Sequence, residues 1–266
     1  MQFINNIINV KSGNAAIKIA LKIVKKLGIQ NIILADQGGW ITYKQFAQKI
    51  KLNIIEIKTD YGVIIPEELK RSINSIPNDQ KSALLIHVMA GYHAVQPTFD
   101  IQDICSNNNI IFILDTTGKL LGNQGFGDIE VASYGKGKLV NLGYGGSIRT
   151  KDEWLGLVKE EIEKNKFDEL REEELNKKIH QIEDRYEMFQ TVRKKIINDL
   201  KDYNIIHKDM EGINVIIKFS SEKDKQEKEK QELINYCKNN NYEYVICPKN
   251  IKVLTDAISI EVKRLE

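Results

Sequence analysis

The 266-residue sequence predicts an α/β fold with a mostly parallel central sheet and helices on both of its faces, followed by a small α+β domain. Between residues 17 and 133, helical stretches alternate with short apolar runs, which is typical of parallel strands joined by crossover helices. Hydrophobic residues make up 42% of the chain, enough to fill a sizeable core. After Arg149 the composition becomes rich in Glu and Lys, which indicates the end of the first domain.

Five apolar runs in the first domain predict strands, with helices between them. The strands are expected at residues 31–35, 54–57, 83–89, 110–114 and 129–133. The first helix, at 15–26, has apolar residues on one face and lysines between them, and it ends at Gly28. Pro66 opens a second helix with acidic residues in its first turn. Asp100 is expected to cap the helix that follows Pro97.

The second half of the chain predicts a helical region and then a small sheet. Residues 151–201 carry a sparse apolar stripe among many charges, which is typical of solvated helices. Later strands are expected at 213–219, 242–247 and 258–262, with a helix at 226–238. The predicted domains are residues 1–150, a helical connector at 151–205, and a small C-terminal α+β domain at 206–266.

Composition excludes several classes of partner. Lys and Arg total 39 against 37 Asp and Glu, so the net charge of +2 predicts binding to neither nucleic acid nor a membrane surface. Residues 1–6 lack a secretory pattern and no apolar run has the length of a membrane span, so we expect a cytoplasmic protein. Histidine spacing predicts no metal site. Three widely spaced residues are expected to be buried thiols: Cys105, Cys237 and Cys247.

Ligands of open parallel sheets bind beyond the carboxyl ends of the strands, so the residues after each predicted strand are candidates for a site. The first strand is followed by a glycine turn and Trp40, which can stack on a planar ring or simply cover the domain edge. Asp115 follows the fourth strand, and a buried carboxylate there needs a cation opposite it. His93, after the third strand, is expected to be a hydrogen-bonded loop histidine.

Two further segments of the sequence supply candidates for an anion-binding site and for a reactive amine. Free amides at the start of the first helix attract anions, although a plain helix cap uses the same kinds of residue. That segment contains Ser12, Gly13 and Asn14. Ser133 ends the fifth strand, and a glycine-rich run with Lys136 and Lys138 follows it. Burial lowers the pKa of a lysine toward that of a nucleophilic amine, but the residues alone do not choose between these two lysines.

An anion site, an aromatic plate, a carboxylate and an amine together suit pyridoxal phosphate (PLP). This cofactor needs its phosphate bound, its ring stacked and its pyridine nitrogen kept protonated by a carboxylate. Its aldehyde is captured by a lysine as an imine.

The order and spacing of these motifs resemble those of fold-type I PLP enzymes, most closely the DegT/DnrJ/EryC1/StrS aminotransferase family. That family has Gly-Asp, a strand, Ser-Phe-x-x-x-Lys and then Gly-Glu-Gly-Gly. Here the same intervals hold Gly127-Asp128, Ser133-Tyr134, Lys138 and Gly143-Tyr144-Gly145-Gly146. The start of the first helix, Ser12-Gly13-Asn14-Ala15-Ala16, is similar to the family's phosphate-binding Ser-Gly-Thr-Ala-Ala.

The resemblance assigns a role to each candidate residue. It implies that Lys138, rather than Lys136, forms the internal aldimine (a Schiff base) and that Asp115 faces the ring nitrogen. It implies that Trp40 stacks on the ring. The phosphate would be bound by Ser12, Gly13, Asn14 and Ser133.

The implied function is a PLP-dependent aminotransferase that acts on a small amino substrate as a homodimer. The sequence departs from the family's Asp-x-Ala-Gln/His pattern, because Thr117 replaces the alanine and Gly118 replaces the polar residue beside the cofactor's phenolic oxygen. No counterpart of a Gly-x-Asn-x-Arg segment is found. A PLP-dependent lyase and a non-catalytic dimerising relative are the alternatives. A Rossmann-type nucleotide binder lacks its Gly-x-Gly-x-x-Gly turn here.

Overall fold

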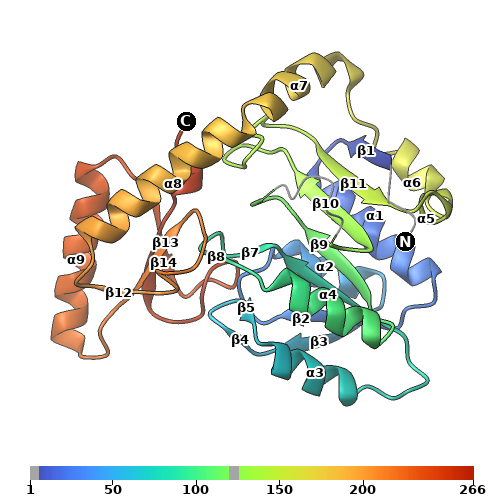
Figure 1. The fold of residues 1–266 in the computed structure, drawn as a ribbon, viewed down its shortest axis with the longest axis horizontal. Coiled ribbons are helices and arrows are strands. Elements are labelled where there is room, and N and C mark those ends of the chain that lie inside the picture. Colours follow the sequence, from blue (N-terminus) through green and yellow to red (C-terminus); the bar gives the residue numbers. More distant parts are fainter. Residues whose placement is uncertain (1–5, 120–125) are drawn as a thin grey trace.

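A seven-stranded sheet forms the centre of the first half of the protein, in a computed structural model that describes residues 6–119 and 126–266 (Figure 1). In spatial order its strands are β1 (Asn6–Val10), β11 (Gly146–Thr150), β10 (Ile129–Ser133), β9 (Ile111–Asp115), β6 (Ser82–His87), β2 (Asn31–Ala35) and β3 (Asn53–Ile57). Neighbours from β10 to β3 are parallel, and β11 is antiparallel to both β1 and β10. The predicted mostly parallel sheet is confirmed.

Helices cover both faces of this sheet, as predicted. Residues of α1 (Gly13–Lys26) and α2 (Thr42–Lys49) share a core with one face. Residues of α3 (Pro66–Asn74) and α4 (Thr98–Asn107) share a core with the other. Successive side chains of a strand point to opposite faces of the sheet, and Ile32 accordingly lies in one core and Ile33 in the other.

Two local expectations were wrong. Asp100 does not cap α4, because Pro97 occupies the N-cap position and Asp100 lies in the first turn without a capping bond. The third strand does not continue to residue 89. It ends at His87, and the chain then forms a small hairpin from β7 (Met89–Ala90) and β8 (Ala94–Val95). The strand therefore ends two residues earlier than predicted, and His87 lies at its carboxyl end.

The second half holds helices and a smaller antiparallel sheet. Its helices α5 (Asp152–Gly156), α6 (Lys159–Glu163), α7 (Glu172–His180) and α8 (Ile182–Asp199) lead to a sheet in the order β12 (Asn204–Ile205), β13 (Val215–Lys218), β15 (Ala257–Ile260) and β14 (Tyr244–Cys247). Helix α9 (Lys223–Asn239) packs on β15. Strand β12 lies inside the segment predicted as a connector, and the domain boundaries at 150 and 205 stay a prediction.

One apolar core extends from the first sheet to the second. It includes Leu84 and Phe112 of the first sheet, Phe189 of α8, and Ile217 and Ile258 of the second sheet, all at most 1% exposed. The two sheets are therefore packed together through α8 and not only joined by a linker.

The three cysteines agree with the prediction from the sequence. All three cysteines are buried and unpaired, which confirms the predicted thiols. Within the described residues, no helix combines the length and the apolar character needed to cross a membrane. The first five residues, part of the segment in which we found no secretory pattern, lie outside the described residues.

Candidate active site

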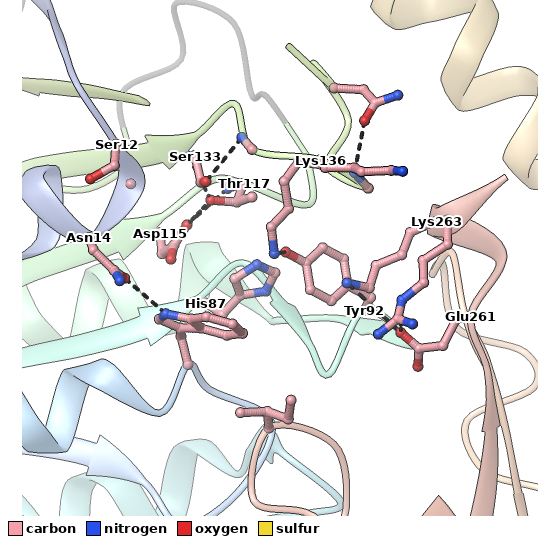
Figure 2. Close-up of a pocket in the computed structure, with 18 of the residues that line it drawn as sticks. Ser12, Asn14, His87, Tyr92, Asp115, Thr117, Ser133, Lys136, Glu261 and Lys263 are labelled. Carbon is pink, nitrogen blue, oxygen red and sulfur yellow. Dashed lines mark hydrogen bonds and ion pairs between the residues drawn. The ribbon is translucent and has the colours of Figure 1, made fainter. Parts of the chain in front are cut away.

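A cavity of about 780 Å³ lies where the parallel strands of the first sheet end. Every site residue predicted from the sequence lines it, namely Ser12, Gly13, Asn14, Trp40, Asp115, Ser133 and Lys138. Figure 2 shows Asn14, Asp115 and Ser133 on one side of this cavity, with Glu261 and Lys263 on the opposite side. The second sheet and the residues after it thus supply the opposite wall.

The first helix presents its N-terminal end, the positive end of its dipole, to the cavity. Ser12 is the N-cap of α1, and its Oγ accepts a hydrogen bond from the amide of Ala15 at 3.1 Å. The amides of Gly13 and Asn14, the first two of the helix, have no acceptor within it and lie at its positive end. A Cβ atom at position 13 would overlap the side chain of Ser133, so only glycine allows this close approach.

Asp115 ends β9 and is held by hydrogen bonds in a buried environment, at 5% exposure. The hydroxyl of Tyr43 donates to Asp115 Oδ2 at 2.6 Å, and Thr117 donates to Oδ1 through both its amide, at 3.0 Å, and its hydroxyl. Burial and the charge of Asp115 raise the pKa of Tyr43 well above its usual value, so Tyr43 remains a donor. The carboxylate is therefore fixed in orientation as it faces the cavity.

The side chain of Thr117 connects Asp115 to Ser133. While its hydroxyl donates to Asp115, its Oγ1 also accepts a hydrogen bond from the amide of Ser133 at 3.0 Å (Figure 2). Threonine at this position, in place of the family's alanine, thus aligns the ends of β9 and β10.

Trp40 is tied to the start of α1. Its Nε1 donates to Asn14 Oδ1 at 3.0 Å, and the hydroxyl of Thr42 donates to the same oxygen at 3.2 Å. Although 37% exposed, the indole lines the cavity, and its ring centroid lies 5.0 Å from the amine of Lys138. The tryptophan therefore faces the site and does more than cover the edge of the domain.

The two lysines of the glycine-rich run have different surroundings. The side chain of Lys136 is 85% exposed and lies 3.7 Å from the carboxylate of Glu266. Lys138 points into the cavity and donates to the hydroxyl of Tyr92 at 3.0 Å. Burial lowers the pKa of Lys138, although attraction to Asp115 opposes the shift. A larger share of Lys138 is therefore a free amine near neutral pH.

His87 lines the cavity and was missed from the sequence. It ends β6 directly opposite Asp115 in the parallel register. Its Nδ1 lies 2.5 Å from the carbonyl oxygen of Met89, and its Nε2 has no hydrogen-bond partner among the described residues. Burial lowers the pKa of His87. We expected the strand to continue past this residue, whereas the earlier end at His87 places it among the residues that follow strands.

Tyr92, Lys252 and Lys263 also line the cavity without having been expected there. His93, which follows Tyr92, was expected to be hydrogen bonded, and this was wrong. Its ring is fully buried, stacks on His207 at 5.6 Å, and has no partner for either ring nitrogen within the part of the chain that the structure describes. It does not line the cavity.

The fold and the strand-end side chains define a class of protein, the fold-type I PLP enzymes. Residues 4–163 match the model of the DegT/DnrJ/EryC1/StrS aminotransferase family. This match covers more than half of the chain, and the protein therefore belongs to that family. Among curated proteins, no sequence matches the chain.

Solved structures share this fold at low sequence identity. A DegT DnrJ EryC1 StrS aminotransferase from Brucella abortus has a TM-score of 0.76 and 13% identity, over 97% of this chain and 81% of its own. PseC from Helicobacter pylori, an aminotransferase involved in the biosynthesis of pseudoaminic acid, has a TM-score of 0.76 and 12% identity over the same shares. A structure of SPT with PLP has a TM-score of 0.73 and 10% identity, over 96% of this chain and 67% of its own.

Proposed function

We propose that this protein is a PLP-dependent aminotransferase for a small amino substrate, with Lys138 as the lysine that binds the cofactor's aldehyde. The observation that carries the proposal is the position of the Lys138 amine. It lies inside the cavity, near the ring of Trp40 and hydrogen bonded to Tyr92, while Lys136 points to solvent. Membership of the aminotransferase family supports the same reaction class.

The residues around the cavity fit the parts of PLP. The amides of Gly13 and Asn14 and the hydroxyl of Ser133 would bind the phosphate, and Trp40 would stack on the ring. Asp115 would keep the ring nitrogen protonated. The unpaired Nε2 of His87 offers a hydrogen bond to a polar group of the ring. When bound, PLP supplies a conjugated ring that withdraws electrons from the substrate's α-carbon.

The protein's own contribution to the chemistry is to move protons and to hold charges. Lys138 Nζ, with its lowered pKa, is suited to take a proton from the substrate's α-carbon and to return it to another atom. Tyr92 orients this amine through its hydroxyl. The pKa of Tyr92 is raised well above its usual value, by burial and by the charges of Asp115 and Glu261, so its hydroxyl stays neutral.

The test is to incubate the protein with PLP, reduce it with borohydride and map the labelled peptide. We expect visible absorbance, and a label on Lys138 that is lost in Lys138→Ala. The matched control, Lys136→Ala, should keep both the absorbance and the label. A label on Lys136 or Lys263 of the unaltered protein, or no PLP binding at all, would contradict the assignment.

The two alternative functions make other predictions. A non-catalytic relative was suggested by Gly118 and by the missing partner segment, but His87 supplies a polar group beside Gly118, and the amine and the carboxylate both line the cavity. This supports a catalytic protein. A lyase would use the same residues, so product analysis with an amino donor and a keto acceptor decides between the two reactions.

We also propose that the protein is a cytoplasmic homodimer that binds neither nucleic acid nor membranes. Its near-neutral charge of +2 and its family membership support this. Light scattering on the purified protein would give the mass of a dimer, and the mass of a monomer would contradict it.

A further inference from the structure

A short hairpin connects the first sheet to the second half of the protein. It consists of β7 and β8, follows β6 directly, and lies between the two sheets (Figure 1). Its backbone is hydrogen bonded to the second half, because the amides of Ile213 and Asn214 donate to the carbonyl oxygen of Tyr92 at 2.8 Å and 2.7 Å. The contact between residues 89–95 and residues 207–214 is here called the hairpin junction.

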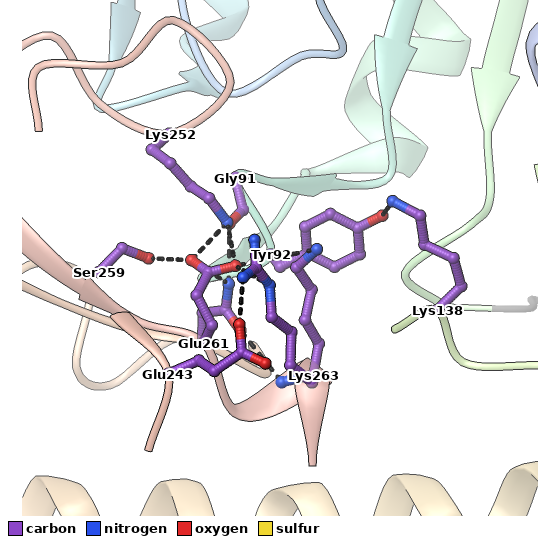
Figure 3. A network of polar contacts seen from close by, with 10 residues as sticks. Gly91, Tyr92, Lys138, Glu243, Lys252, Ser259, Glu261 and Lys263 are labelled. Atoms are coloured by element: carbon purple, nitrogen blue, oxygen red, sulfur yellow. Dashed lines mark hydrogen bonds and ion pairs between the residues drawn. The ribbon is translucent and has the colours of Figure 1, made fainter. Parts of the chain in front are cut away.

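The hairpin also contacts the loop that follows β14. Lys252 Nζ donates to the carbonyl oxygen of Gly91 at 3.3 Å and lies 2.9 Å from Glu261 Oε2 (Figure 3). Burial alone would raise the pKa of Glu261, but attraction to Lys252 and Lys263 and hydrogen bonds from Lys252 and Ser259 outweigh burial and lower it. The charge of Lys252 is therefore matched by an ionised Glu261, and the hairpin offers it only a neutral carbonyl group.

His93 belongs to the hairpin junction and is fully buried. Its ring stacks on that of His207, with the centroids 5.6 Å apart and the planes inclined by 16°. Its carbonyl oxygen lies against Gly212, where a Cβ atom would be only 2.0 Å away. Among the described residues, neither ring nitrogen of His93 has a hydrogen-bond partner. This is unusual, because buried polar groups are normally hydrogen bonded.

The charged groups that act on this ring are cations. Arg193 of α8, Lys252 of the loop after β14, and His207 when it is protonated would each repel a charge on His93. Each of these cations has a carboxylate of its own: Asp60 lies 3.8 Å from His207, Asp209 attracts Arg193, and Glu261 pairs with Lys252. The surroundings of His93 therefore suit a neutral ring.

A proton on His93 would need an acceptor for each of its two N–H groups, and the closed junction provides none among the described residues. Burial lowers the pKa of His93 from 6.5 to about 3, and repulsion from His207, Lys252 and Arg193 adds to this shift. The backbone of Ala90 opposes the shift but makes no hydrogen bond with the ring. The closed junction thus excludes a proton that an exposed histidine binds readily.

We propose that His93 makes the hairpin junction sensitive to acid: a proton binds to its ring only after the junction opens, so that mild acidification favours an open form. Opening would move the wall of the cavity that carries Lys252 and Lys263 away from Tyr92. Since the closed form binds fewer protons, the open fraction rises as pH falls below 6.5, by about tenfold for each pH unit. This inference does not depend on the cofactor.

The test is hydrogen exchange of backbone amides, followed by NMR on the full chain without added PLP and corrected for the intrinsic exchange rate. The reporters are the amides of Val95, Ile213 and Asn214, which donate across the hairpin junction. We expect their protection factors to fall by about thirtyfold between pH 7.5 and pH 5.0. We also expect them to lie below those of β2 throughout, because the junction opens while the sheet stays folded. Protection equal to that of β2 at every pH, or no fall with pH, would overturn the proposal.

Two variants show whether His93 is the group that binds the proton. His93→Phe keeps an aromatic ring of similar size that cannot be protonated, so the protection factors should change less than about threefold over the same range. The matched control is His180→Phe, which removes an exposed histidine of α7 and should keep the full pH dependence. An unchanged pH dependence in His93→Phe would overturn the proposal, as would its loss in His180→Phe.

Thermal unfolding at pH 7.5 checks that His93→Phe is folded. We expect no loss of stability, because two buried nitrogens without partners are removed. The comparison between the hairpin junction and β2 is made within the unaltered protein, so it tests the opening even where a variant fails to fold.

Discussion

The imidazole of His87 lies in tight contact with the position that a Cβ atom on residue 118 would take. The Cε1 atom of His87 is 3.0 Å from the point at which a Cβ atom on Gly118 would stand. The family resemblance expects a polar residue at position 118, and here glycine leaves room for a polar ring from the neighbouring strand. In the function proposed above, His87 would supply the polar group that position 118 lacks, because the strand register brings it opposite Asp115.

Gly118→Ala should therefore displace His87. The new methyl group would be 3.0 Å from the imidazole and 3.2 Å from the Cβ of Met89, so we expect a loss of about 1–3 kcal/mol in the free energy of unfolding, together with weaker PLP binding. Urea unfolding and PLP titration measure the two effects. Gly156→Ala is the control, because outside its chain neighbours and its own helix no atom lies within 4 Å of its Cβ, and it should be neutral or slightly stabilising. Full PLP affinity in Gly118→Ala would contradict the role given to His87.

Asp115→Asn should impair turnover much more than folding. The amide oxygen can still accept from Thr117, and the amide nitrogen can donate to the hydroxyl of Tyr43, but the charge that would stabilise a protonated ring nitrogen is lost. We expect activity to fall by roughly two orders of magnitude or more. Tyr43→Phe keeps the carboxylate and removes one of its donors, so its loss should be smaller. Equal losses in the two variants would show that orientation, and not charge, is what Asp115 contributes.

Lys252→Met should destabilise the protein strongly. It would leave Glu261 ionised and buried without its closest cation, which typically costs about 3–5 kcal/mol. The comparison is Lys44→Met, which breaks an exposed pair with Glu56 and should cost at most about 1 kcal/mol. Denaturant unfolding at neutral pH distinguishes the two variants. A small effect of Lys252→Met would mean that water or another cation replaces the lost ammonium.

Stability should depend on pH through Lys263. Its pKa is about 6 in the folded protein and near 10.5 when unfolded, so between these values the unfolded state binds more protons and stability rises with pH. Burial is the largest cause of this low pKa, repulsion from Lys252, Lys138 and Arg264 adds to it, and attraction to Glu261 opposes it. Lys263→Met removes this contribution, so the advantage of the variant over the unaltered protein should be largest near pH 6 and shrink toward pH 9. Urea unfolding across this range measures it, and parallel curves would disprove the low pKa.

Much of the first sheet could be predicted because its strands are short apolar runs bounded by turn residues. Strands β2 and β10 have the predicted bounds. Strand β11 was missed because its sequence, GSIRT, has one large apolar residue and carries little intrinsic strand signal. Strand β1, with the sequence NIINV, has three β-branched apolar residues among five and could have been predicted. Their pairing is fixed by hydrogen bonds to each other and to β10, between segments far apart in the chain.

The residues of the candidate site also fall into those that could be predicted from the sequence and those that could not. Residues that directly follow strands, such as Asp115, or that precede a helix, such as Ser12, could be found from the sequence because topology alone brings them to one edge. Lys252 and Lys263 reach the cavity from a loop and from the segment after the last strand, and Tyr43 contacts Asp115 from helix α2. Their positions depend on tertiary packing, which a local sequence pattern does not predict.

The shared apolar core holds the phenol ring of Tyr92 in a fixed position between Lys138 and Lys263. Because the first sheet, α8 and the second sheet pack as one core, the walls that carry Lys138 and Lys263 are held together across that ring. The separation of these two walls is therefore set by the packing of the core and by the width of one aromatic ring.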